Sequence, residues 1–194
     1  MELKRLLKTI RMEKITQIAV TGANRSGTGF GAYILARELK SIFVHERAFS
    51  TNDLKAFTKE VASKERMVLM CPSLLHCAQR FPENVLVVVM NRALSEILES
   101  QRRCNWQPTD LRPYEEMRVF DMSQPIAHIK YQFADKYLSR ERRIEYLDYD
   151  SLYGHPDFVE RRGRKGFGCH QIEKKKKVVK IRMDFRKKKG KVKK

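Results

Sequence analysis

The chain has 194 residues, with 41 Lys+Arg against 23 Asp+Glu and a formal net charge of +18. This length suits one domain with a substantial core and excludes two domains of ordinary size. The charge is concentrated at one end, because residues 161–194 hold 17 basic and 2 acidic side chains and the remainder carries a net +3. We therefore expect one domain over residues 1–168, with an N-terminal extension over 1–14, followed by a Lys-rich tail over 169–194.

Composition also indicates the cellular compartment and whether a metal site is expected. No apolar run approaches the roughly 20 residues that a membrane-spanning helix needs, and the first 14 residues are too charged for a secretory signal. We expect a cytoplasmic protein without a membrane span. Cys71, Cys77, Cys104 and Cys169 form no CxxC pair, which favours reduced thiols, and they match no standard ligand spacing, so we expect no metal site.

The predicted elements alternate along the chain. Three nearly continuous apolar runs indicate buried parallel strands. Helical spacing of apolar residues indicates the helices between them, and Thr51 and Asn52 are the predicted N-cap residues of one of these helices. The strands are predicted over 15–21, 43–49, 67–71, 85–90 and 144–149, and the helices over 29–41, 53–63, 93–103 and 124–139. Residues 104–125 lack a clean period and are predicted to be irregular. The alternation predicts an α/β fold with a central, mainly parallel sheet flanked by helices.

The segment GANRSG, residues 22–27, matches the first six positions of the phosphate-loop pattern GxxxxGK[ST]. It follows a predicted strand and precedes a predicted helix, so its backbone N–H groups and the helix N-terminus are expected to face one anion. Thr28 stands where the motif's lysine would be, and Gly29 where a hydroxyl would bind magnesium. The strand over 85–90 is followed by Asn91 and Arg92 and not by a metal-binding aspartate. The loop therefore predicts phosphate binding without the parts specific to ATP and magnesium.

The residues NRSGT, 24–28, resemble the loop of the PAPS-dependent sulfotransferases, P-loop relatives that bind the donor's 5′-phosphosulfate with a motif close to [KR]-S-G-T-[ST]. In that family a strand-end arginine and a serine eight residues later hold the donor's 3′-phosphate. The stretch VLVVVMNRALSEILES places Arg92 and Ser100 at this spacing. The resemblance implies a three-layer P-loop fold, PAPS as co-substrate and no required metal.

Two further segments are similar to the same family. Residues 144–159 look like its closing segment, and Arg164, Lys165 and Gly166 resemble the Arg-Lys-Gly stretch that closes over the 3′-phosphate in cytosolic members. The tryptophan-bearing continuation of that stretch is missing. Cys71 also occupies the place where cytosolic members carry their catalytic histidine.

These features lead to the hypothesis of a small sulfotransferase that moves a sulfuryl group from PAPS to a hydroxyl or amine. Negative charge accumulates on the bridging oxygen during transfer, and Arg25 with the N–H groups of Ser26, Gly27, Thr28 and Gly29 is suited to neutralise it. The acceptor's proton needs a base. Glu46 stands where glycan-modifying members place a catalytic glutamate, upstream of Phe49, and His76 and His45 are the alternative candidates.

Two other functions remain open from the sequence. One is a P-loop nucleotide or nucleoside-monophosphate kinase, and the other is a catalytically silent nucleotide-binding protein with a polyanion-binding tail. The run of lysines over 174–194 predicts attachment to a nucleic acid or an acidic glycan. The acceptor is expected to bind around residues 104–124, and no motif there identifies it.

Overall fold

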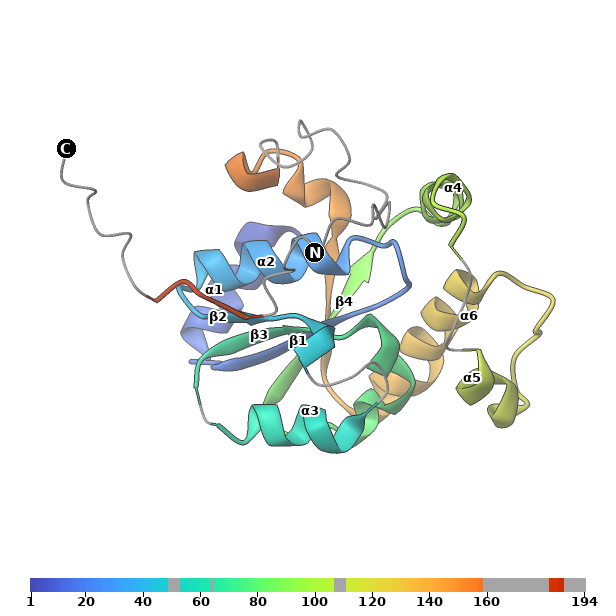
Figure 1. Ribbon diagram of the computed structural model, residues 1–194, viewed down its shortest axis with the longest axis horizontal. Helices are drawn as coiled ribbons and strands as arrows, with labels where there is room; N and C mark the ends of the chain where they lie inside the picture. Colours follow the sequence, from blue (N-terminus) through green and yellow to red (C-terminus); the bar gives the residue numbers. More distant parts are fainter. Residues whose placement is uncertain (49–52, 64, 107–110, 159–181, 187–194) are drawn as a thin grey trace.

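The computed structural model describes residues 1–48, 53–63, 65–106, 111–158 and 182–186, which form one sheet flanked by helices (Figure 1). The sheet has six strands in the order β5-β4-β1-β3-β2-β6. Five strands are parallel and β6 runs antiparallel to β2. The bounds are β1 (Gln17–Thr21), β2 (Ile42–Val44), β3 (Met67–Met70), β4 (Val85–Asn91), β5 (Ile144–Asp148) and β6 (Arg182–Asp184). The expected α/β fold with a mainly parallel sheet is confirmed.

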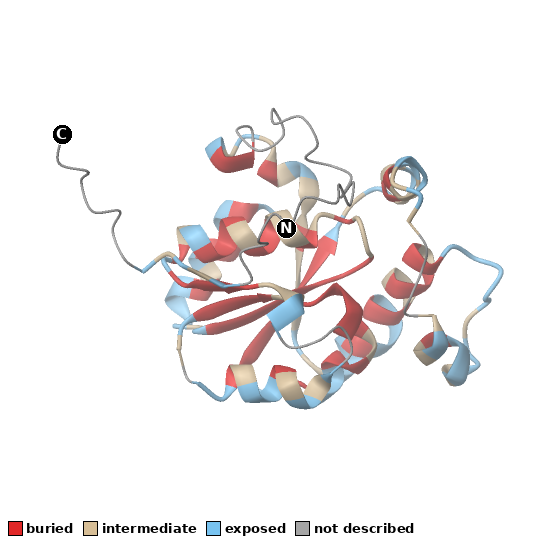
Figure 2. Ribbon diagram, in the orientation of Figure 1, coloured by how far each residue is buried: buried red, intermediate tan, exposed pale blue. Residues whose placement is uncertain are grey.

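Helices cover both faces of this sheet. The helices α1 (Leu3–Met12) and α2 (Thr28–Glu38) pack on one face, and α3 (Leu54–Val61), the 3-10 helix η2 (Pro72–Arg80) and α6 (Ile126–Phe133) pack on the other. Both faces of β1 are buried because Ile18 and Val20 point to the first layer and Ala19 to the second. Burial follows this layering, with buried strands between half-exposed helices (Figure 2). No helix among the described residues is long and apolar enough to cross a lipid bilayer.

Residues 1–14 differ from the expected extension, because α1 is part of the core. Its buried side chains are Leu3, Leu6, Leu7 and Ile10, at the i, i+3, i+4 and i+7 spacing of an amphipathic helix. The charged residues between them face outward. The high charge of this segment therefore coexists with a complete apolar stripe that docks on the sheet.

Several predicted elements have different bounds in the structure. The strand predicted over 43–49 ends at Val44, and a 3-10 turn follows over Glu46–Ala48. Asp53, and not Thr51 or Asn52, caps α3, because its carboxylate accepts from the Ala56 N–H at 3.0 Å. The region predicted to be irregular contains α5 (Arg112–Met117). The helix predicted over 124–139 is α6 followed by a π-helical turn, η3 (Ala134–Leu138), and then α7 (Ser139–Glu141).

Residues 182–186, which the sequence assigned to the tail, belong to the sheet. Strand β6 pairs with β2, where Met183 lies opposite Phe43. Phe185 packs edge-on against Tyr33, with ring centroids 5.2 Å apart. Arg182 bonds both Glu60 and Glu65, each at 2.7 Å, and Arg186 bonds Glu65 at 3.0 Å. The sheet edge is thus closed by a strand from the far end of the chain.

We expect truncation after residue 181 to lower the free energy of unfolding by about 2–4 kcal/mol relative to truncation after residue 186, because only the longer protein keeps the packed Met183 and Phe185. Thermal or urea denaturation of the two truncated proteins measures this difference. Equal stabilities would show that β6 adds nothing to the fold. The longer protein lacks residues 187–194, with six lysines, so it also tests polyanion binding by that segment without loss of the strand.

Candidate functional site

The glycine loop between β1 and α2 has a left-handed backbone at three positions. The φ angles are 134° at Gly22, 76° at Arg25 and 98° at Gly27. Gly27 caps α2 and offers no side chain to its first turn, and that turn holds no acidic residue. The first N–H groups of α2 and the positive end of its dipole therefore meet no neutralising side chain from within the helix. This arrangement suits an anion, as predicted from the motif.

The hydroxyl of Ser26 lies inside the loop. It is fully buried and has no hydrogen-bond partner among the described residues. A Cβ built on Gly22 would meet Ser26 Oγ and the Met90 carbonyl oxygen, each at 3.2 Å, so the loop folds closely onto β4. An unsatisfied buried hydroxyl costs about 1–3 kcal/mol. It indicates that the complete site contains a further hydrogen-bonding group, such as water or a bound anion.

The position of the loop in the sheet also favours a ligand site. β1 lies between β3 and β4, so its carboxyl end is flanked by the residues that follow those two strands. The chain leaves β1 into α2 on one face, whereas it leaves β3 into η2 on the opposite face. In open α/β sheets, ligands bind in the crevice where adjacent connections diverge in this way.

On the β4 side, the structure brings together three residues that were predicted to bind the donor. Arg25 Nε donates to Ser100 Oγ at 3.2 Å, and Arg92 Nη1 donates to the backbone carbonyl of Arg25 at 3.0 Å. Ser100 is buried on α4 (Leu94–Arg103). Arg92 is also paired with Glu96 at 2.8 Å, so a phosphate there would share or displace this carboxylate.

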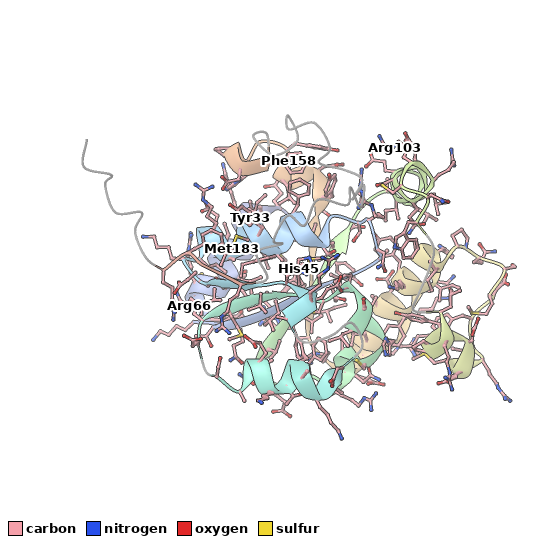
Figure 3. All side chains as sticks on the ribbon, viewed as in Figure 1. Tyr33, His45, Arg66, Arg103, Phe158 and Met183 are labelled. Carbon is pink, nitrogen blue, oxygen red and sulfur yellow. The ribbon has the colours of Figure 1, made fainter. Side chains whose placement is uncertain are left out.

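Tyr149 is part of the same cluster, a role that the sequence did not identify. It follows β5, and the Arg92 guanidinium carbon lies 4.2 Å from the centre of its ring. A Cβ built on Gly27 would lie 2.4 Å from the Tyr149 ring, so the ring packs directly on the start of α2. Phe158, which is labelled in Figure 3, packs edge-on against the Tyr149 ring with centroids 5.6 Å apart. The Phe158 and Phe30 ring centroids are 5.0 Å apart.

Two neighbouring residues of α6, both of which were missed, bond to the site: Lys130 contacts the loop, and Tyr131 contacts the residues at the end of β4. Lys130 Nζ donates to Asn24 Oδ1 at 2.6 Å and to the Pro72 carbonyl at 3.3 Å. Tyr131 Oη accepts from the Arg92 N–H at 3.1 Å and lies 3.2 Å from the Met90 and Arg92 carbonyls. Burial raises the pKa of Tyr131 to about 12, so its hydroxyl stays protonated and can donate. The sequence signal for Lys130 was a lysine on the apolar face of a helix, between Ile126 and Phe133.

The candidate bases lie on the β3 side or farther away. Glu46 follows β2, and its Oε2 accepts from Ser73 Oγ at 3.1 Å. Because Ser73 follows β3, this bond places the Glu46 carboxylate near the end of that strand. Burial raises the pKa of the Cys71 thiol well above its usual value, and the charge of Glu46 adds to this effect. His45 lies at the end of β2 (Figure 3), and His76 packs against Tyr114 with ring centroids 6.2 Å apart.

Other predicted residues lie outside the described parts of the chain. These are Phe49, the segment with Arg164, Lys165 and Gly166, Cys169 and most of the basic tail. Their roles stay predictions. Within the described ranges, no three His, Cys, Asp or Glu side chains gather in a way that could hold a metal ion.

Comparison with known proteins adds no relative. A scan against protein-family models, a search of curated proteins and a search of solved structures each found no significant match.

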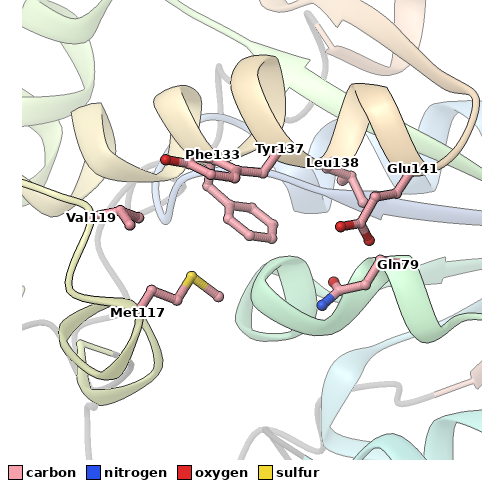
Figure 4. Close-up of a pocket in the computed structure, with 7 residues that line it drawn as sticks. All are labelled: Gln79, Met117, Val119, Phe133, Tyr137, Leu138 and Glu141. Carbon is pink, nitrogen blue, oxygen red and sulfur yellow. The ribbon is translucent and has the colours of Figure 1, made fainter.

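A cavity of about 260 Å³ lies away from the glycine loop (Figure 4). Its wall is mostly apolar, with Met117 from α5 and Phe133 from α6 facing each other across it, and Gln79 and Glu141 at one side. The helices α6 and α7 lead back to the start of β5, so the cavity lies toward the amino-terminal edge of the sheet. It is therefore separate from the crevice at the carboxyl end of β1.

Proposed function

We propose that the crevice at the end of β1 binds the phosphate groups of PAPS, and that the protein is a small sulfotransferase. The observation that carries this proposal is the contact of Arg25 with Ser100 and of Arg92 with the loop backbone. A strand-end arginine and a helix serine thus meet the glycine loop, as the resemblance to the PAPS-dependent family implies for a 3′-phosphate site. The uncapped start of α2 and the unsatisfied Ser26 hydroxyl support an anion beside them.

In the proposed reaction the acceptor's oxygen or nitrogen forms a bond to sulfur, and the bond between sulfur and the bridging oxygen breaks. The electron pair of that bond leaves with the 5′-phosphate of PAP. Arg25 and the N–H groups at the start of α2 stabilise the negative charge that develops there. The acceptor's proton passes to a base, for which Glu46 is the proposed residue because its bond to Ser73 places its carboxylate at the same edge of the sheet, near the end of β3.

A kinase is a weaker candidate for the same loop. Thr28 and Gly29 stand where lysine and a magnesium-binding hydroxyl would be needed, and the residue after β4 is a cation. A sulfuryl group carries less charge than a terminal phosphoryl group, so a loop without these parts suits the former better.

We expect PAP to bind without divalent metal and at least about tenfold more tightly than AMP, because a charge-assisted phosphate contact contributes about 1.5–3 kcal/mol. Calorimetry with PAP, AMP, ATP and ATP plus magnesium measures this. Ser100→Ala should lower PAP affinity toward that of AMP and leave AMP affinity unchanged. The control is Ser95→Ala, an exposed serine on the same helix. Equal affinities for PAP and AMP would contradict the 3′-phosphate site, and tight binding only of ATP with magnesium would favour a kinase.

A further inference from the structure

Lys130 places its amino group in the interior of the protein, next to the glycine loop. Its side chain is fully buried, and it comes from the face of α6 that packs on the sheet. It bridges Asn24 in the loop and the Pro72 carbonyl after β3. The cluster of Arg25, Arg92 and Ser100 lies on the β4 side. Basic side chains therefore lie on both sides of the loop.

Stability alone is a poor reason for a buried ammonium. Removing a lysine amino group from water is costly, and well-packed apolar residues of similar volume are often equally or more stabilising at such positions. The neighbouring buried positions on this face, Ile126, Ile129 and Phe133, are all apolar. The lysine at this position contacts Asn24, the second variable residue of the glycine loop, which points to a role at that loop.

We propose that Lys130 is a positioning residue of the phosphate site, and that its charge replaces the lysine missing from the loop motif. It acts by holding the Asn24 side chain against the turn after β3 and by attracting the donor's anionic groups through the low-dielectric interior. This inference rests on the proposed function for the nature of the donor. The attraction itself requires only an anion in the loop.

The test compares Lys130→Met, which keeps the length of the side chain, with Lys130→Arg, which keeps the charge. The probes are PAP and inorganic pyrophosphate, measured by calorimetry, together with thermal denaturation of the protein without ligand. We expect Lys130→Met to lower both affinities about tenfold or more, and to lower the melting temperature by a few degrees because Asn24 Oδ1 and the Pro72 carbonyl lose their donor. Lys130→Arg should stay within about threefold of the wild type. Lys136→Met, an exposed lysine on the next turn, is the matched control and should change neither quantity.

The remaining outcomes contradict the Lys130 inference, the proposed donor, or both. Wild-type affinity in Lys130→Met overturns the inference, as does an equal loss of binding in the Met and Arg variants. If Lys130→Met does not fold, Asn24→Asp replaces it, because a carboxylate at position 24 neutralises the charge of Lys130. Retained pyrophosphate affinity in Asn24→Asp also overturns the Lys130 inference. Binding of pyrophosphate but not PAP refutes the proposed donor and leaves the Lys130 inference to be decided with pyrophosphate. Binding of neither refutes both.

Discussion

Gly27→Ala should unfold the site locally and lower PAP affinity by about 100-fold. The backbone at Gly27 has φ 98°, a conformation that costs a residue with a side chain about 1–3 kcal/mol. The added Cβ would also lie 2.4 Å from the Tyr149 ring. The ring must move, and Arg92, which stacks on it, must move as well. Loss of two charge-assisted hydrogen bonds from the loop to the anion is sufficient for the expected loss of affinity. Calorimetry with PAP and thermal denaturation measure both effects.

Two other glycines serve as controls for this substitution. At Gly29 a Cβ would lie 3.5 Å from Met70 Sδ, an ordinary contact, so Gly29→Ala should keep the loop and stabilise the first turn of α2 slightly. At Gly154 no heavy atom lies within 4 Å, and Gly154→Ala should be neutral. Undiminished PAP binding by Gly27→Ala would show that the start of α2 does not hold the anion. The double variant Gly27→Ala/Tyr149→Ala removes the steric clash but keeps the backbone strain. Its PAP affinity therefore shows how much of the loss each cause contributes.

Glu46→Gln should lower the turnover of PAPS by about 10² to 10⁴ while PAP affinity stays within about twofold, because glutamine keeps the shape of the side chain but cannot take a proton. The release of PAP from PAPS in the presence of candidate hydroxyl and amine acceptors measures turnover. Ser73→Ala removes the described hydrogen bond to Glu46 and should have a smaller effect, about tenfold. Glu83→Gln, at an exposed position, is the control for loss of a surface charge.

The alternatives to Glu46 make distinct predictions. If Glu46→Gln is fully active and His45→Ala or His76→Ala is not, the base is that histidine. Because His76 packs against Tyr114 in the described structure, its substitution should also lower thermal stability, whereas Glu46→Gln should not. A wild-type protein that binds PAP but releases none from PAPS with any acceptor would be the silent nucleotide-binding protein.

The strands and the glycine loop could be predicted because their signals are local. Continuous apolar runs mark buried parallel strands, and the run of glycine, serine and threonine after one of them marks the anion loop. Arg92 and Ser100 were singled out as a 3′-phosphate site by the spacing that the resemblance implies. Both lie beside the loop, where each contacts Arg25, and their role stays a prediction.

The missed parts depend on contacts between distant residues. Lys130 is 106 positions from Asn24, and nothing in its own neighbourhood indicates where its ammonium lies. Tyr149 contacts Gly27 only because β5 joins the sheet two strands away from β1. The apolar stripe of α1 is present in the sequence. Because the residues between its members are mostly charged, the segment was predicted to be an extension outside the core. The short helix α5 has Pro113 in its first turn and is too short to show a full period of the helical pattern.

The closure of the sheet by β6 has a consequence for protein synthesis. Val44 and Arg182 pair across 138 positions of the chain, so at about 5–20 residues per second the open edge of β2 waits about 7–28 s for its partner strand to be made. During that interval β2 presents unpaired backbone groups that another nascent chain could pair with. The finished edge is short and alternates Arg182, Asp184 and Arg186, a charge pattern that opposes such pairing. The risk of misassembly is therefore concentrated in the ribosome-bound chain. The need for a chaperone should fall once residue 186 has left the ribosome and β6 can pair with β2.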